Sequence, residues 1–128
     1  MHRSRIGVVL VDHPVETYEA GATFWAAAHG SARTGELTDD DPYQSLDHLP
    51  GGLLLELQQT GPGTAPRVHL DIEADDVAAE VARLEALGAR AADQRDGYAI
   101  MTDPGGLVFC VVPVQSGEAF EAHATTWP

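Results

Sequence analysis

The sequence predicts an α+β fold in which a strand, a helix and further strands follow one another twice along the chain. Apolar and polar residues alternate from Arg67 to Glu73, as they do in a strand with one covered face. Apolar residues then recur at helical spacing from Val77 to Gly88, and the turn signal Asp103-Pro-Gly-Gly106 precedes the apolar stretch Leu107 to Val112. The earlier part of the chain repeats this order of elements, so we expect two modules of one kind.

The first module is predicted to run from about residue 5 to residue 60. Ile6 to Val11 is a continuous apolar strand, which is typical of a central strand covered on both faces. A helix follows Pro14 and stops at Gly30, because apolar residues recur at helical spacing up to this glycine. The segment Ser31 to Gly52 has no clear period, and Leu53 to Gln59 is the next clear strand.

A linker rich in glycine and proline, residues 61–66, separates this module from the second, which is predicted to span residues 67–113. Asp76 places negative charge where the second helix begins, and Gly88 ends this helix. Asp96-Gly97 then marks a turn before the strand Tyr98 to Thr102.

The whole chain, residues 1–128, is expected to form a single domain, since 128 residues are enough for one core. The tail, residues 114–128, has no regular period. We expect its Phe120 and Trp127 to pack back on the domain or on a partner subunit, and their apolar area favours a homodimer.

The chain is strongly acidic, with 20 acidic and 7 basic side chains and a formal net charge of −13. Such a surface repels phosphate backbones instead of releasing their counterions, so nucleic acid is not an expected partner. Two interpretations of the charge stay open. It supports solubility, or it attracts a cationic small molecule.

Cysteine content and hydropathy bear on location. The single cysteine, Cys110, permits no intrachain disulfide, so nothing indicates an oxidising compartment. The apolar run near the start stops at Asp12, which makes it too short for a signal peptide or a membrane span. We therefore expect a cytoplasmic protein that does not bind membranes.

Several features of the second module resemble, in order, the second βαβββ module of the vicinal oxygen chelate superfamily. These are the run His69-Leu-Asp-Ile72, the pair Asp76-Val77, the helix end Leu87-Gly88, and Asp103-Pro-Gly-Gly106 before a final strand. The superfamily includes glyoxalases, bleomycin-resistance proteins and extradiol dioxygenases, so the resemblance implies a glyoxalase-like domain. It also implies that the two modules pair into an open, cup-shaped mixed sheet with the helices on its outer face, and that residues 31–52 hold two short strands. It names no reaction, because unrelated chemistries share this scaffold.

In such a fold the helices cover one face of the sheet, so strand parity predicts which side chains line the ligand pocket. If the helix covers Val68, Leu70 and Ile72, then His69 and Asp71 point into the pocket. Similar counting on the other strands adds a carboxylate, a thiol and a guanidinium. The predicted ligand pocket is Arg5, Glu56, His69, Asp71 and Cys110.

The resemblance further implies four strand positions at which metal-dependent members carry their ligands, and this chain has Arg5, Glu56, His69 and Cys110 there. His69 and Glu56 suit a divalent cation. Arg5 would repel one, because a guanidinium stays protonated. Cys110 suits zinc but not hard cations. Because only half of the ligand set is kept, we predict no metal and no other cofactor.

Three functions follow from this pattern. The first is a metal-independent small-molecule-binding protein whose ligand lies beside Glu56 and His69. The second is a metal-dependent lyase, isomerase or dioxygenase that uses Glu56, His69 and Cys110. The third is an interaction module whose pocket is filled by its own side chains. The sequence leaves open whether the chain is an enzyme, and no catalytic residue is predicted.

Overall fold

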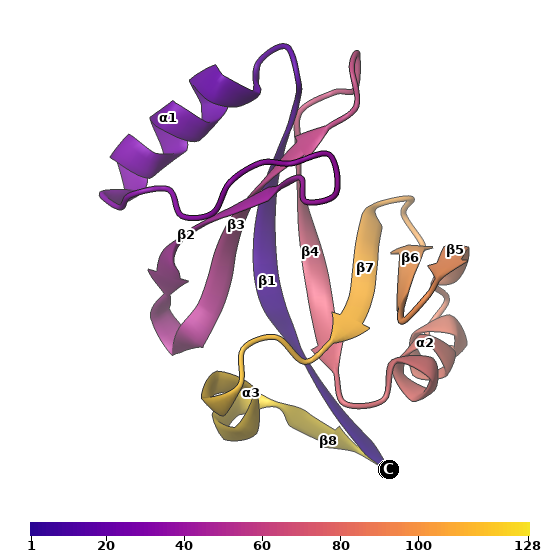
Figure 1. Ribbon diagram of the computed structural model, residues 1–128. Coiled ribbons are helices and arrows are strands. Elements are labelled where there is room, and N and C mark those ends of the chain that lie inside the picture. The colour runs from indigo at the N-terminus through magenta and orange to yellow at the C-terminus, as the bar shows by residue number, and fades with distance from the viewer. The chain divides into compact units, whose positions relative to one another are not determined.

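The computed structural model describes all 128 residues, and it contains three α-helices, one short 3₁₀ helix and eight strands (Figure 1). In chain order the elements are β1 (His2–Pro14), α1 (Tyr18–His29), β2 (Tyr43–Leu49), η1 (Pro50–Gly52), β3 (Leu53–Thr60), β4 (Arg67–Ala74), α2 (Val77–Ala86), β5 (Arg90–Arg95), β6 (Tyr98–Thr102), β7 (Val108–Pro113), α3 (Glu118–His123) and β8 (Thr125–Trp127).

The strands form one open sheet. Hydrogen-bonded neighbours follow the order β2-β3-β1-β4-β7-β6-β5, and β8 pairs with β1. The sheet is mixed, because β4 and β7 are parallel whereas β6 is antiparallel to both β5 and β7. This topology confirms the predicted α+β class with an open, mixed sheet.

The chain divides into two compact units. Unit one comprises Met1–Val8, Gly51–Leu53 and Leu70–Pro128, and unit two comprises Val9–Pro50 and Leu54–His69. Strands β1 and β4 each contribute residues to both units. The beginning of β1 therefore belongs to the same unit as α2.

Unit two is built around α1, which lies beside β2 and β3 (Figure 1). Its buried core consists of Val11, Tyr18, Ala22, Leu46 and Leu57. The helix ends as predicted at Gly30, whose left-handed backbone (φ 75°) is a conformation that glycine adopts without a steric penalty.

The early boundaries in unit two differ from the prediction. β1 extends to Pro14, so α1 begins at Tyr18 and Pro14 is a strand residue. Of the two short strands expected within residues 31–52, one is present as β2. The other is reduced to a single bridge between Thr34 and Ser45.

Unit one has its core under α2. Buried Val81 and Leu84 of this helix cluster with Ala99, Met101 and Val111 of β6 and β7. The helix begins where the sequence predicts, because the Asp76 side chain accepts a hydrogen bond from the Ala79 backbone N–H at 3.0 Å.

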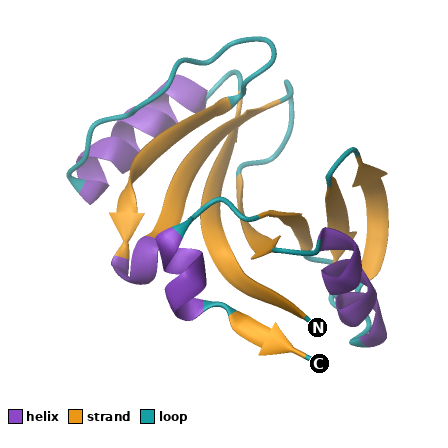
Figure 2. Cartoon of the chain, turned by 60° about the horizontal axis from the view of Figure 1, so that its bottom comes forward, coloured by secondary structure: helices purple, strands orange, loops and turns teal.

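The tail folds back on unit one as α3 and β8. β8 runs antiparallel to the start of β1, with His2 opposite Trp127, so the two ends of the chain lie side by side (Figure 2). Phe120 is 1% exposed, and the Trp127 indole N–H donates to the Ser4 hydroxyl at 2.8 Å. The prediction that both aromatic residues pack back is confirmed. They therefore do not offer the free area that the homodimer was expected to use.

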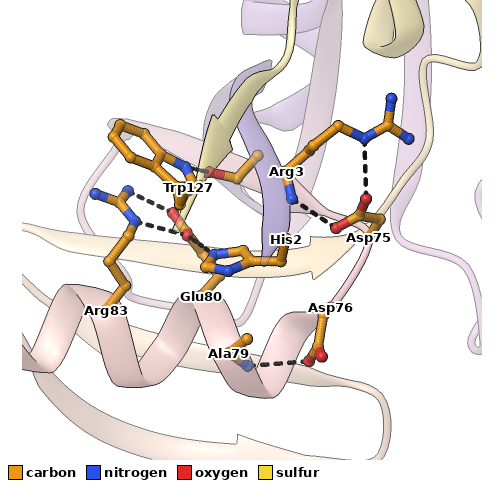
Figure 3. A network of polar contacts seen from close by, with 9 residues as sticks. His2, Arg3, Asp75, Asp76, Ala79, Glu80, Arg83 and Trp127 are labelled. Carbon is orange, nitrogen blue, oxygen red and sulfur yellow. Dashed lines mark hydrogen bonds and ion pairs between the residues drawn. The ribbon is translucent and has the colours of Figure 1, made fainter.

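A buried carboxylate holds this region together (Figure 3). His2, Ser4 and Arg83 donate hydrogen bonds to the two oxygens of Glu80, at distances of 2.6–2.9 Å. The Arg83 guanidinium also stacks on Trp127, 3.7 Å from the ring centre. Burial alone would raise the pKa of Glu80, but the hydrogen bonds from Arg83, His2 and Ser4 outweigh it and lower the pKa.

None of the helices has both the length and the apolar content that a bilayer crossing requires.

Candidate functional site

The helices decide which face of the strands is available for binding. In unit two, Val11 and Leu57 lie in the core against α1, so the neighbouring residues Asp12 and Glu56 project from the opposite face. In unit one, Ile72 packs on the α2 core, so Asp71 projects away from α2. His69 precedes Asp71 by two residues on β4 and shares its side of the strand.

The burial pattern along β4 is the reverse of that in a simple amphipathic strand, where apolar side chains are buried and polar ones are exposed. His69, Asp71 and Glu73 are all buried, whereas the apolar Val68 is 54% exposed. The expectation that a helix covers Val68 is therefore wrong, although it holds for Ile72. The polar side of this strand is the better covered one, and each buried polar group on it needs partners.

His69 is held by a carboxylate from β1. Its Nδ1 lies 2.7 Å from Oδ2 of Asp12, and both side chains are buried, at 5% and 0% exposure of the two residues. Arg67 donates its Nε–H to the same oxygen at 3.1 Å. The second oxygen, Asp12 Oδ1, is buried and has no hydrogen-bond partner.

Asp12 was not predicted as a site residue, because in the sequence it marks only the end of an apolar strand. The available signal was an acidic residue directly after a central apolar run, where a buried carboxylate requires a basic partner.

Glu56 on β3 lies in the same unit as His69. Its Oε2 accepts a hydrogen bond from the Ser45 hydroxyl of β2 at 2.9 Å. On the next residue pair of the same two strands, the Gln58 amide donates to the Tyr43 hydroxyl at 3.2 Å. Glu56 is thus part of a polar row on the face opposite α1.

Asp71 and Cys110 lie side by side in unit one. They are register partners on the parallel strands β4 and β7, and their ligand atoms are within 4.8 Å of each other. Val111 belongs to the α2 core, so Cys110 points to the opposite side. The predicted pocket residues Asp71 and Cys110 are therefore brought together.

Arg5 has a different environment from the one expected. Its NH1 donates to the backbone oxygens of Gly51 and Ala119 at 3.1 and 3.0 Å, and its Nε lies 3.5 Å from Glu73. Arg5 therefore contacts the buried carboxylate of Glu73 and the backbone of the tail at Ala119.

Glu73 is the anchor of that contact, and sequence reasoning did not single it out. Its carboxylate accepts hydrogen bonds from the backbone N–H groups of Gln115 and Ser116, at 2.9 and 3.0 Å, and from the Ser116 hydroxyl. Glu73 thereby fixes the point at which the tail leaves β7.

Within unit one, Asp71 and Cys110 could offer a metal ion one carboxylate and one thiolate. A thiolate fits zinc better than magnesium or calcium. Within unit two, the contact between Nδ1 of His69 and Asp12 is of the kind that orients a metal-binding imidazole.

A hollow of about 250 Å³ lies elsewhere in unit one, between α2 and the strands β5 and β6. Its lining is Val77, Ala78, Val81, Gln94, Arg95, Gly97, Tyr98 and Ala99. No residue of the predicted pocket lines it, so it is not the predicted site.

The family model for the glyoxalase-like domain matches residues 8–112. No curated protein matches the chain.

Solved structures resemble the fold. A methylmalonyl-CoA epimerase variant from Streptomyces coelicolor is 16% identical, with a TM-score of 0.59 over 85% of this chain and 96% of that chain. A hypothetical protein from Bacillus halodurans is 10% identical, with a TM-score of 0.63 over 88% of this chain and 95% of that one. The Mn(II)-bound glyoxalase from Novosphingobium aromaticivorans is 22% identical, with a TM-score of 0.56, and the match covers 84% of this chain but 39% of that chain.

At these identities the structural matches show the fold alone. Together with the family match, they confirm the predicted relationship to the vicinal oxygen chelate superfamily.

Proposed function

We propose that this chain, which belongs to the glyoxalase-like domain family, binds a small molecule without a metal ion. The proposed site is the face of the strands that carries Glu56 and His69. The observation that carries the proposal is the buried pair of His69 and Asp12, whose atoms Nδ1 and Oδ2 are 2.7 Å apart. Burying two ionisable groups costs desolvation energy that apolar residues of similar size would avoid. A buried ionisable pair on the face away from the helices is therefore a reasonable marker of function.

Charge supports a ligand that is neutral or cationic and carries hydrogen-bond donors. Asp12 and Glu56 offer carboxylates on this face, and the whole chain has a net charge of −13. The S. coelicolor epimerase is in complex with 2-nitronate-propionyl-CoA, and a CoA ester carries several negative phosphates. The acidic face of this chain would repel such a ligand.

The alternative is a metal-dependent lyase, isomerase or dioxygenase that uses Glu56, His69 and Cys110. One observation favours a version of it in which Asp71 takes the place of Glu56, namely that Asp71 and Cys110 bring their ligand atoms within 4.8 Å. A bound metal would act as a Lewis acid on a substrate oxygen.

Isothermal titration with zinc, manganese, nickel and iron(II) tests the choice between these two. The metal-free proposal predicts no sub-micromolar binding of any of the four ions. Tight binding that is lost in His69→Ala but kept in His123→Ala, a control at an exposed histidine, would reject it in favour of the alternative. Elemental analysis of untagged protein purified without chelators provides an independent check.

A thermal-shift screen of small metabolites and cationic antibiotics would identify the ligand, since a molecule that binds only the folded state raises the melting temperature. Hits are expected to lose their effect in both His69→Ala and Glu56→Ala. Hits that persist in both variants would contradict the proposed face. Cytoplasmic location and homodimer formation stay predictions, and size-exclusion chromatography with light scattering checks the second.

A further inference from the structure

We propose that the outer face of α1, centred on Phe24, is the surface through which two copies of this chain associate. The inference goes beyond the proposed function, because it concerns a helix that carries none of the proposed ligand residues. It also assigns the expected homodimer to a different surface, since the tail residues Phe120 and Trp127 pack within their own chain.

The outer face of α1 presents two aromatic rings to solvent. Phe24 is 61% exposed and Trp25 is 41% exposed, and the two rings meet edge to face with their centroids 5.1 Å apart. Tyr18 and Ala22 are buried in the core of unit two, so the inner face of the helix is already occupied. Grouped, exposed aromatic side chains are typical of interaction surfaces, because they offer a large apolar area for burial.

Charge decides which partner fits this face. No residue from Ala20 to Ala28 is charged, in a chain whose net charge is −13. The one acidic residue of α1 is Glu19, and Arg33 donates from NH1 and NH2 to its two oxygens at 2.9 and 2.8 Å. A charged partner therefore finds no complementary group on this face. A second copy is repelled by the acidic side chains elsewhere, and it can approach most closely where they are absent.

The exposed row is also self-complementary. Residues four apart lie on one side of a helix, so the exposed residues Ala20, Phe24 and Ala28 form one row. This row lies about 200° around the helix from buried Tyr18 and Ala22, because each residue turns the helix by about 100°. The row reads the same in both directions from Phe24. Two such helices can pair antiparallel about a two-fold axis at Phe24, with each phenyl ring over the small alanines of the partner helix.

The size of the face predicts a weak, reversible dimer. A helix of 12 residues is about 18 Å long, and its outer face offers less area than the roughly 800 Å² per partner of a standard interface. Repulsion between the two acidic chains opposes association, and dissolved salt screens this repulsion. We expect a dissociation constant in the micromolar range that falls as the sodium chloride concentration rises. A contact held by ion pairs would show the opposite dependence on salt.

Sedimentation equilibrium over a concentration series tests the proposal. The unaltered protein should pass from monomer to dimer as its concentration rises, and Phe24→Glu should raise the dissociation constant by about tenfold or more. Leu87→Glu is the matched control, because Leu87 is an apolar residue of unit one that is 67% exposed and its replacement adds the same charge. This control should leave the dimer intact.

The arrangement of the two helices has a separate test. In a Cys110→Ser background, Ala20→Cys and Ala28→Cys proteins are mixed in equal amounts and oxidised by dissolved oxygen. The mixed disulfide should form faster than either symmetric one, because these two positions face each other across the proposed axis. Faster formation of the symmetric Ala20→Cys disulfide would indicate parallel helices and would overturn the two-fold pairing at Phe24.

Three results would overturn the assignment of this surface. They are a monomer at every concentration, a dimer that Phe24→Glu does not weaken, and equal weakening by Phe24→Glu and Leu87→Glu. Phe24 is exposed, so its variant should fold, as circular dichroism checks. If it does not, Ala28→Glu takes its place, with the same expected weakening from the same exposed row.

A bilayer is the other occupant that an apolar helix face could meet. Helices that lie on membranes carry lysine or arginine on their polar face, and α1 contains neither. Cosedimentation with phosphatidylcholine vesicles should therefore leave the protein in solution. Vesicle binding that Phe24→Glu abolishes, in a protein that stays monomeric, would assign the face to a bilayer and reject the proposal.

Discussion

Glu80 illustrates, at the scale of a single residue, how this chain stabilises a buried carboxylate. Three side chains donate to its two oxygens, and the carboxylate is fully buried. Removing the carboxylate would leave the Arg83 and His2 donors without their acceptor. Such losses are expensive because the remaining polar groups stay partly or fully desolvated.

We therefore expect Glu80→Ala to lower the free energy of unfolding at neutral pH by about 3 kcal/mol. Because the folded-state pKa of Glu80 lies below its ordinary value of 4.5, its stabilising effect is present above that value and is lost as the pH falls through the folded pKa. Urea unfolding at a series of pH values measures both effects.

The control is Glu85→Ala, at an exposed position of the same helix. It should change the stability by no more than about 0.5 kcal/mol. Equal losses for Glu80→Ala and Glu85→Ala would show that the network contributes nothing of its own.

Tyr18 gives a prediction on the alkaline side. Its hydroxyl donates to Gln44 at 3.0 Å, and burial raises its pKa from 10.0 to about 12, with Arg33 acting in the opposite direction. Stability that depends on the neutral phenol is complete below pH 10 and is lost as the pH rises toward about 12. The window is clear of lysine titration, because all seven basic residues are arginine.

Tyrosinate absorbance should therefore show a late ionisation step for Tyr18, and Tyr18→Phe should remove that step. Urea unfolding of the same pair of proteins should show a steeper alkaline loss of stability in the unaltered chain. A late step that survives in Tyr18→Phe would refute the assignment.

At this scale the sequence predicted part of the candidate site. Strand alternation was sufficient to place Asp71 and Cys110 on the face away from α2 and to direct Glu56 away from α1, because the face of a side chain depends only on parity. Asp12 and Arg5 were not foreseeable in the same way. Their environments depend on the neighbouring strand and on the tail, which parity within one strand does not describe.

At the scale of the elements, the glycine within α1 has a structural reason. A Cβ at Gly21 would lie 2.5 Å from Nε2 of His13, so the His13 ring occupies the space that a side chain would need. A glycine within a helix lowers stability by about 1 kcal/mol relative to alanine. At position 21 it leaves the space in which His13 of β1 packs against α1.

We expect Gly21→Ala to destabilise the protein by about 1 kcal/mol or more, because overpacking outweighs the gain in helix propensity. In a His13→Ala background the same change should stabilise the protein, since the clash is gone. A double-mutant cycle by thermal or urea unfolding measures the coupling. Stabilisation in both backgrounds would show that the ring moves aside without cost.

The elements that the sequence predicted well carry their own local signals. Asp76 caps α2, Gly30 ends α1, and Asp103 closes its turn by accepting from the N–H groups of Gly105 and Leu107 at 2.8 and 2.9 Å. The elements that were missed, α3 and β8, are six and three residues long. Segments this short have no measurable period, and tertiary contacts determine their conformation.

At the scale of the whole molecule, the net charge of −13 is the dominant property. Repulsion among so many carboxylates opposes the folded state, and dissolved salt screens it. We expect the melting temperature to rise from low to high sodium chloride, as measured by circular dichroism. A fall in melting temperature would indicate that the arginine–carboxylate pairs contribute more to stability than the repulsion removes.

The family was predictable at this scale because it depends on the order of elements along the chain, which the sequence displays. The ligand of this family member was not predictable from the sequence. Two polar side chains on the same face of the strands, such as Glu56 and His69, are compatible with several chemistries.

The pairing of β8 with the start of β1 has a consequence for how this protein is made. His2 lies opposite Trp127, so these two strands can join only after all the residues between these paired positions have been synthesised. Until then the start of β1 has an unsatisfied edge. A nascent chain of this kind is exposed to mispairing during translation, and a chaperone that covers the start of β1 would be of most use at that stage.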